Sequence, residues 1–318
     1  MNTSLRRRNF MKTAMLAASA VPLARLGQAA AADQLPSQPK EVLPTGKIGS
    51  VEFSRLMLGG NMMGGYAHAR ELRYVSQLMR RYHTEAKILE TLEIAEANGV
   101  NTLNSPAWTS AGFLKKHWAN GGKIKWIAQT IPSQQGLLDM FKQAVDNGAT
   151  AVQFEGDSAE GLQSKGRFGD IVKAIEFVKS QKCLAGVGAH GMWLVRQCEE
   201  EKVPLDFYLK TLHTHDYFSA PKAIEEADQG RNDNYWCRDP QEVIKYMHNV
   251  RRSWIAFKVM AAGAIPPRVA FTHAFNAGAD FVLAGMFDWQ IAENVKIARE
   301  VLAGVKRSRP LPETGAAK

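Results

Sequence analysis

Short apolar runs alternate with amphipathic segments along most of the chain, between Arg55 and Leu302. The segments between the runs space their apolar residues as a helix with one buried face does, for example at Ile171, Ile175 and Val178. Eight runs occur, at Arg55–Leu58, Thr102–Leu103, Trp126–Ala128, Ala151–Phe154, Leu184–Val187, Phe207–Leu212, Trp254–Val259 and Phe281–Leu283. Eight strand–helix units over about 250 residues predict a (β/α)8 TIM barrel in one domain, with a doubly wound open sheet as the alternative.

Turn and cap residues mark the expected helix ends. Asn98-Gly99, Asn147-Gly148 and Ala277-Gly278 each precede a predicted strand, where glycine accepts the left-handed conformation that ends a helix. Asp239-Pro240 has the side-chain cap and the first-turn proline of a helix start. No GxGxxG motif follows the first strand, so a Rossmann-type dinucleotide site has no support.

Two predicted connections are long, at residues 59–83 and 213–239. Both follow a strand and therefore lie at the C-terminal face of a barrel, where active sites form. Long loops are usually functional or disordered. Because these two are rich in aromatic and polar residues, we expect ordered lids over a polar ligand, with surface decoration or a dimer contact as the alternative.

The first 32 residues resemble a twin-arginine export signal. Arg7-Arg8-Asn9-Phe10-Met11-Lys12 precedes an apolar run and then small residues. The resemblance implies contact with the twin-arginine translocase and a periplasmic or otherwise exported protein. An amphipathic start to the domain is the alternative. The expected organisation is a signal at 1–32, a linker at 33–46, the barrel at 47–305 and a flexible tail at 306–318.

Charge and cysteine content exclude some classes of protein. The chain has 40 basic and 31 acidic side chains, and the five basic ones in residues 1–32 leave a net charge of +4 on the rest. That small excess does not indicate a nucleic-acid partner. No later segment is apolar enough for stable membrane insertion. Cys183, Cys198 and Cys237 permit one disulfide and leave one thiol over.

Two stretches resemble the aldo/keto reductases. Residues 45–59 are similar to that family's opening hairpin and first strand, and Phe281–Asn294 is similar to its eighth strand and following helix. The resemblance implies an N-terminal hairpin before the barrel and NADP(H) as a possible cofactor. The family's catalytic Asp, Tyr, Lys and His positions are changed, and correspond here to Asn104, Thr109, Thr130 and Glu155. The resemblance therefore supports the fold better than the reductase mechanism.

Polar residues end several predicted strands and suggest a metal centre. Side chains at the tops of neighbouring barrel strands converge, which would bring together Glu155, His190, and His213 or His215. One carboxylate and two imidazoles suit a divalent Zn, Mn, Fe or Co ion. Alternatively, the histidines bind substrate or loop backbone without a metal.

Two lysines lie inside apolar strand patterns, Lys210 and Lys258. A buried lysine is costly unless it is paired or functional, and two close together would lower one another's pKa and make one a nucleophile. Leu209–Thr211 and Phe257–Gly263 weakly resemble the paired lysine strands of class I deoxyribose-phosphate aldolases. Alternatively, each lysine pairs with a carboxylate such as Asp206 or binds an anionic substrate group.

Aromatic, amide and charged groups in the long loops and beside the second strand suit a sugar-like ligand. The candidate substrate-binding residues are His68, Arg70, Asn104, Asp233, Asn234 and Trp236.

These observations leave three hypotheses. The first is an exported lyase or isomerase for a polyhydroxylated carbonyl compound. In it, Glu155 or His190 moves the proton, and Lys258, Lys210 or a metal stabilises the enolate. The second is an NADP(H)-dependent oxidoreductase with rearranged catalytic groups. The third is a non-catalytic small-molecule binding protein.

Overall fold

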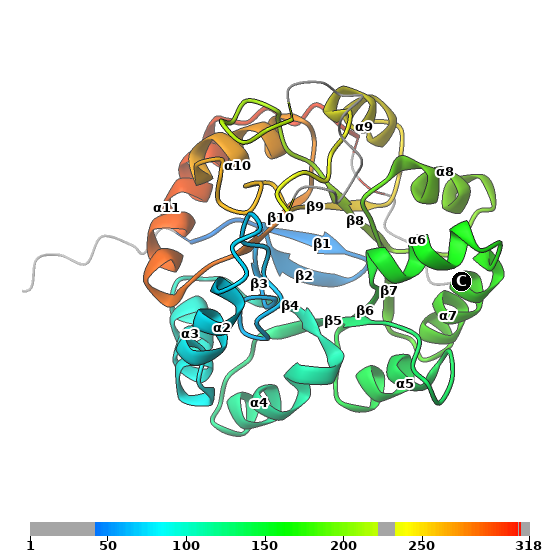
Figure 1. Ribbon diagram of the computed structural model, residues 1–318, viewed down its shortest axis with the longest axis horizontal. Coiled ribbons are helices and arrows are strands. Elements are labelled where there is room, and N and C mark those ends of the chain that lie inside the picture. Colours follow the sequence, from blue (N-terminus) through cyan, green and yellow to red (C-terminus); the bar gives the residue numbers. More distant parts are fainter. Residues whose placement is uncertain (1–41, 222–232, 311, 313–318) are drawn as a thin grey trace, which may run out of the picture. The chain divides into compact units, whose positions relative to one another are not determined.

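A closed barrel of parallel strands forms the centre of the computed structural model, which describes residues 42–221, 233–310 and 312 (Figure 1). The strand order around the barrel is β10-β3-β4-β5-β6-β7-β8-β9. The strands are β3 (Leu56–Gly59), β4 (Thr102–Pro106), β5 (Lys125–Thr130), β6 (Ala151–Phe154), β7 (Leu184–Ala189), β8 (Phe207–Thr211), β9 (Ser253–Phe257) and β10 (Phe281–Gly285). The predicted TIM barrel is confirmed, and closure excludes the open sheet.

Helices surround the barrel (Figure 1). They are α2 (Val75–Tyr82), α3 (Glu85–Ala97), α4 (Ala107–Ala119), α5 (Asp139–Asp146), α6 (Gly156–Ser164), α7 (Phe168–Ser180), α8 (Met192–Glu200), α9 (Pro240–Met247), α10 (Pro267–Asn276) and α11 (Asp288–Gly304). The predicted punctuation holds. Gly99 and Gly278 follow helix ends with φ angles of +85° and +93°, and the Asp239 side chain accepts hydrogen bonds from the amides of Gln241 and Glu242.

Strand alternation divides the buried side chains into two layers. An inner cluster fills the barrel and includes Phe207 and Leu209 of β8, whereas Tyr208 belongs to the outer cluster between barrel and helices. Side chains along a strand point alternately to opposite faces. Lys210 therefore shares the outward direction of Tyr208, which decides its role below.

A hairpin of β1 (Thr45–Ile48) and β2 (Val51–Ser54) precedes the barrel. Its Ile48 and Phe53 are fully buried in the inner cluster with Met57 and Phe281. The predicted N-terminal hairpin is therefore present. Thr45 and Gly46, assigned to the linker in our sequence analysis, form part of this hairpin. The proposed export signal lies outside the described residues, as do residues 33–41.

The start of the expected flexible tail is packed against the barrel. Arg309 is 2% exposed. Its guanidinium contacts Asp280 at 2.5 Å and donates to the carbonyls of Met247 and Val250. Residues 307–309 thus make specific contacts with the barrel, and flexibility of the segment 306–318 stays a prediction.

Two further features bear on the sequence-based expectations. Cys183, Cys198 and Cys237 are all free thiols, so they form no disulfide with one another. Across the described ranges, none of the helices has both the length and the apolar character required to cross a bilayer.

Candidate functional site

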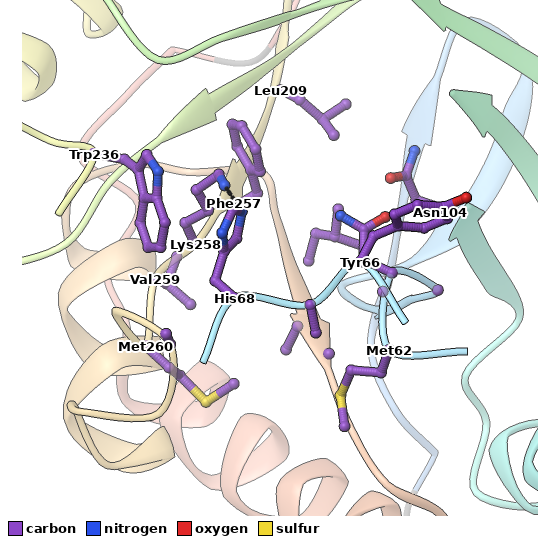
Figure 2. A pocket seen from close by; sticks show the side chains of 18 of the residues that line it. Met62, Tyr66, His68, Asn104, Leu209, Trp236, Phe257, Lys258, Val259 and Met260 are labelled. Atoms are coloured by element: carbon purple, nitrogen blue, oxygen red, sulfur yellow. Dashed lines mark hydrogen bonds between the residues drawn. The ribbon is translucent and has the colours of Figure 1, made fainter. Parts of the chain in front are cut away.

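A cavity of about 720 Å³ opens at the C-terminal end of the barrel (Figure 2). Its walls come from the ends of the strands and from the loops that follow them. This is the face at which TIM-barrel enzymes carry their active sites. Among the predicted site residues, His68, Asn104, Glu155, His190, Trp236 and Lys258 line this cavity.

Three side-chain amides in the cavity wall form a linked network. Asn104 Nδ2 donates to Gln153 Oε1 at 2.9 Å, and Gln129 Nε2 donates to Asn104 Oδ1 at 2.6 Å. Gln129 faces the cavity, whereas Thr130 lies on the other side of β5 and donates to the Gln153 carbonyl. Our sequence analysis missed Gln129 and Gln153. The sequence feature that could have identified them is a glutamine at an inward-facing position of a largely apolar strand.

Lys258 follows β9 directly and points its amine into the cavity. Its backbone has a φ angle of +57°, a left-handed conformation that is strained for lysine. Its Nζ lies 4.0 Å from the centre of the Trp236 ring and 2.5 Å from His68 Nε2. Burial lowers the pKa of Lys258 to about 8, although the carboxylates of Asp157, Glu155 and Asp233 act in the opposite direction.

His68 connects Lys258 to Asp233. Its Nδ1 lies 2.6 Å from Asp233 Oδ1, while the second carboxylate oxygen accepts hydrogen bonds from the amides of Ala69 and Glu71. Because Asp233 accepts a hydrogen bond from the Nδ1–H group, His68 Nε2 is the acceptor for the lysine amine. Burial, and then the nearby Lys258, lower the pKa of His68 to about 4. At neutral pH, His68 is therefore uncharged.

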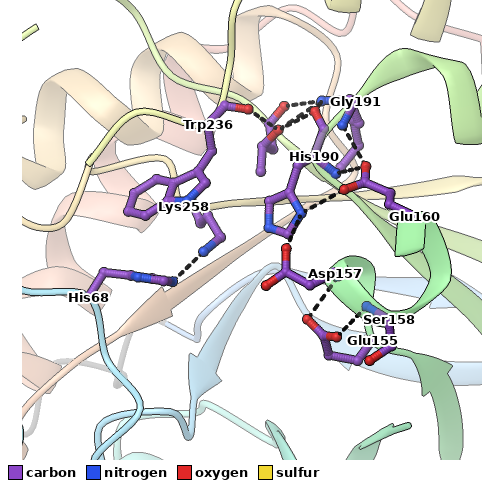
Figure 3. Close-up of polar contacts among 11 residues, drawn as sticks. His68, Glu155, Asp157, Ser158, Glu160, His190, Gly191, Trp236 and Lys258 are labelled. Atoms are coloured by element: carbon purple, nitrogen blue, oxygen red, sulfur yellow. Dashed lines mark hydrogen bonds and ion pairs between the residues drawn. The ribbon is translucent and has the colours of Figure 1, made fainter. Parts of the chain in front are cut away.

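The carboxylate of Asp233 is held in its ionised form. Burial acts to raise its pKa, but the amides of Ala69 and Glu71 and the His68 ring outweigh that effect and lower it. Asp233, His68 and Lys258 thus form one hydrogen-bonded chain that joins the loops after β3, β8 and β9. Figure 3 shows the contact between His68 and Lys258.

His190 faces Lys258 across the cavity (Figure 3). Its Nδ1 lies 3.2 Å from both Asp157 Oδ1 and Glu160 Oε2. Glu160 also accepts hydrogen bonds from the amides of His190 and Gly191, each at 2.7 Å. These contacts fix the ring and make Nδ1 the donor. Glu160 was not predicted, because it lies inside α6 and meets His190 only through the tertiary fold.

Glu155 caps α6. Its carboxylate accepts hydrogen bonds from the amides of Asp157 and Ser158 at 3.1 and 2.9 Å. This side chain lines the cavity but uses both oxygens to hold the helix start. It therefore contributes fixed negative charge to the wall.

The predicted metal set of Glu155, His190, His213 and His215 does not form. His213 is fully buried, with Nδ1 directed at the Thr214 carbonyl and Nε2 accepting the amides of Trp236 and Cys237. His215 Nε2 bonds to the Cys237 carbonyl. Both rings therefore form hydrogen bonds to the backbone of the loop after β8 and are not arranged as metal ligands. Among described residues, the group with suitable spacing is Asp157, Glu160 and His190, whose ligand atoms lie within 4.8 Å of one another.

Lys210 lies outside the cavity. It is fully buried in the outer layer, and its Nζ donates to the His190 carbonyl and to the Thr211 hydroxyl and carbonyl at 2.7 to 3.1 Å. Burial lowers its pKa. The predicted pairing of two lysine amines is therefore wrong. Lys210 supports the backbone of His190 from behind.

Two other predicted substrate contacts also lie elsewhere. Arg70 is exposed and is not part of the cavity wall. Asn234 is buried and donates to Ser219 Oγ at 2.7 Å.

Cys237 is fully buried, and burial raises the pKa of its thiol. A nucleophilic role for Cys237 has no support.

Comparison with known proteins identifies the architecture alone. No protein-family model matches the chain, and no curated protein does. A putative aldo-keto reductase from Pseudomonas aeruginosa has a similar structure, with a TM-score of 0.55 and 14% identity, covering 83% of this chain and 98% of that one. Gox0644 without ligand gives 0.53 and 12%, covering 87% and 100%. A Gox0644 variant in complex with NADPH gives 0.51 and 13%, covering 84% and 96%. The chain thus shares the TIM-barrel fold of these proteins.

Proposed function

We propose that the protein is an enzyme of the lyase or isomerase kind that acts on a small carbonyl compound through Lys258. The observation that carries this proposal is the hydrogen-bonded chain Asp233–His68–Lys258, which presents a lysine amine to the cavity opposite His190. Among the described residues, no carboxylate lies within ion-pair distance of Lys258 to hold it as a permanent cation.

The pKa of Lys258 makes its amine a usable nucleophile. A pKa of about 8 leaves about a tenth of the amine neutral at pH 7, far more than for an exposed lysine. His68, with a pKa of about 4, is too weak a base to store the proton. Its part is to accept a hydrogen bond and aim the Nζ lone pair toward the cavity.

The chemistry then follows from the amine and the facing imidazole. Nζ attacks the substrate carbonyl, and loss of water gives an iminium ion that withdraws electrons from the neighbouring carbon. His190 Nε2 lies opposite and removes a proton from that carbon or from a hydroxyl beyond it. Proton return to a different atom isomerises the substrate, whereas cleavage of the adjacent carbon–carbon bond makes the reaction a lyase. In either case, water then hydrolyses the iminium ion, which releases the product and restores the Lys258 amine.

The polar wall favours a substrate with hydroxyl groups. Asn104, Gln129 and Gln153 offer amide groups to such a ligand. The composition of the loop suggested that the Trp236 ring stacks against a sugar. Lys258 and the His68 ring already pack against Trp236, which makes this ring less suitable for that role. We therefore assign hydroxyl recognition to the three amides.

Reductive trapping tests the proposal directly. The protein is incubated with D-glyceraldehyde and borohydride, and the modified residue is located by mass spectrometry of peptides. We expect one adduct per chain on Lys258 and its loss in Lys258→Met. Lys173→Met is the matched control, because the Lys173 side chain is exposed and does not line the cavity. Labelling confined to exposed lysines would contradict the proposal.

The second candidate is an NADP(H)-dependent oxidoreductase. Its support is the shared architecture, together with the NADPH that the Gox0644 variant binds. Gly285, Gln290 and Asn294, from the region that resembles the reductases, also line the cavity. Within the described residues, however, no arginine lines it and Lys258 is its single lysine, so the phosphates of NADP(H) do not fit.

A divalent metal is the other cofactor considered. Asp157, Glu160 and His190 would be its ligands, and a bound ion would polarise a carbonyl. Glu160 already serves two backbone amides and Asp157 is largely exposed, which makes this a weak site. Elemental analysis of protein prepared without chelator tests it, and a stoichiometric metal lost in His190→Ala would favour metal-assisted chemistry.

A further inference from the structure

We propose that the cavity excludes phosphorylated and other anionic ligands and selects an uncharged carbonyl substrate. The proposal rests on the function assigned above and adds the charge class of the substrate. It follows from three properties of the described cavity wall: its charges, its backbone donors and its apolar surface.

The charged side chains of the wall do not form an anion site. Lys258 is the single lysine among the described lining residues, and its amine is already bonded to His68. Glu155 and Asp157 are carboxylates on the facing wall. The two histidines of the wall are also engaged with charged side chains. His68 bonds Asp233 and Lys258, and His190 bonds Asp157 and Glu160. A phosphate would therefore be repelled by the carboxylates of Glu155 and Asp157 on one wall. On the other wall, it would compete with His68 for the Lys258 amine.

Backbone amides are the usual alternative donors for phosphate, and at the starts of α6 and α8 and in the loop after β3 they are occupied by the protein's own carboxylates. Glu155 holds two amides at the start of α6, Glu160 holds two before α8, and Asp233 holds two in the loop after β3. A helix start attracts anions through free N–H groups. Here that attraction is satisfied internally.

On the side of the barrel that most often binds phosphate, the two helix starts offer few free N–H donors. In TIM barrels this site lies at the loops after the seventh and eighth strands, which here are β9 and β10. The turn into α10 carries Pro266 and Pro267, which lack N–H groups. The first turn of α11 contains Asp288, whose carboxylate accepts a hydrogen bond from the Trp289 amide.

Much of the remaining wall is apolar. Met62, Met79, Leu283 and Phe287 line it, and Tyr66 and Trp108 lie at its edge with ring centres 6.0 Å apart. The Trp108 indole donates to the Tyr66 hydroxyl at 3.1 Å, which fixes both rings. An uncharged molecule buries surface against these groups without losing the hydration of an anion.

Paired aldehyde probes test the charge selection. Wild-type protein is trapped with borohydride in the presence of D-glyceraldehyde or D-glyceraldehyde 3-phosphate, and adducts on Lys258 are counted. We expect the neutral aldehyde to react at least about tenfold faster. Equal rates, or faster trapping of the phosphate, would overturn the selection and leave the Lys258 chemistry intact.

Direct binding separates the two proposals. Wild-type protein is titrated with inorganic phosphate and, separately, with NADPH in a calorimeter. We expect no saturable binding of either ligand. Micromolar binding of either would overturn the exclusion whether or not Lys258 can be trapped. If neither aldehyde labels Lys258, the proposed function fails, and these titrations still decide the charge selection.

A gain of binding provides the sharpest test. Glu155→Gly removes the carboxylate that occupies the Asp157 and Ser158 amides, and we expect phosphate affinity to rise by about tenfold or more. Glu201→Gly is the matched control, because it removes an exposed carboxylate at the end of α8 that does not line the cavity. Equal phosphate binding by the two variants would contradict the role given to Glu155.

Discussion

At the scale of single residues, the reactivity of Lys258 depends on where its backbone places it. The left-handed turn after β9 sends the amine into the cavity, and burial lowers its pKa to about 8. Because the neutral amine reacts, we expect the rate of trapping to rise with pH through a midpoint near 8 and then level off. The measurement is the initial trapping rate against pH. A rate still rising steeply above pH 10 would indicate an ordinary exposed lysine.

Asp233 is a positioning residue in the same chain. Its charge raises the pKa of Lys258, so Asp233→Asn is expected to move the midpoint of the pH profile downward. The variant also loosens His68, and we expect the maximal rate to fall by about tenfold or more. A purely structural defect would lower the rate without moving the midpoint. Asp216→Asn is the control, since Asp216 does not line the cavity and is not among the groups that shift the pKa of Lys258.

At the scale of elements, the strand and helix pattern predicted the barrel, but not the direction of every side chain. The run Phe207–Leu212 carries apolar residues on both of its alternating sets of positions, because a parallel strand is buried on both faces. Such a run contains no alternation, so it could not show that Lys210 points outward. His213 and His215 were misassigned for a different reason. Their hydrogen-bond partners are backbone groups of Trp236 and Cys237, which lie more than 20 residues further along the chain and could not be paired with these rings from the sequence.

The same pattern did locate Asn104, Glu155, His190 and Lys258 at the cavity. Each lies at or just beyond the C-terminal end of a barrel strand, where convergence follows from topology alone. Which pairs touch could not be predicted. The His68–Asp233 contact joins residues 165 positions apart through two loops.

The segment after α11 makes a testable contribution to stability. Arg309 is buried with Asp280, and Arg309→Ala leaves that carboxylate and three carbonyls with fewer partners. We expect a loss of about 3 kcal/mol in the free energy of unfolding, seen as a lower thermal midpoint. Arg307→Ala, which removes a more exposed contact to Asp280, should cost less. Equal, small effects would show that the buried contact does not stabilise the barrel.

At the scale of the whole molecule, the proposed export route and the proposed chemistry constrain one another. The twin-arginine pathway carries proteins that have already folded, so we propose that the cavity is complete before the chain leaves the cytoplasm. Replacing Arg7 and Arg8 with lysine should leave a full-length precursor in the cytoplasm, measured by fractionation and immunoblotting. That retained precursor should still be trapped on Lys258, because the substitutions lie outside residues 42–310. Normal export of the double-lysine variant would contradict the route, and a retained but unreactive precursor would place maturation of the site after export.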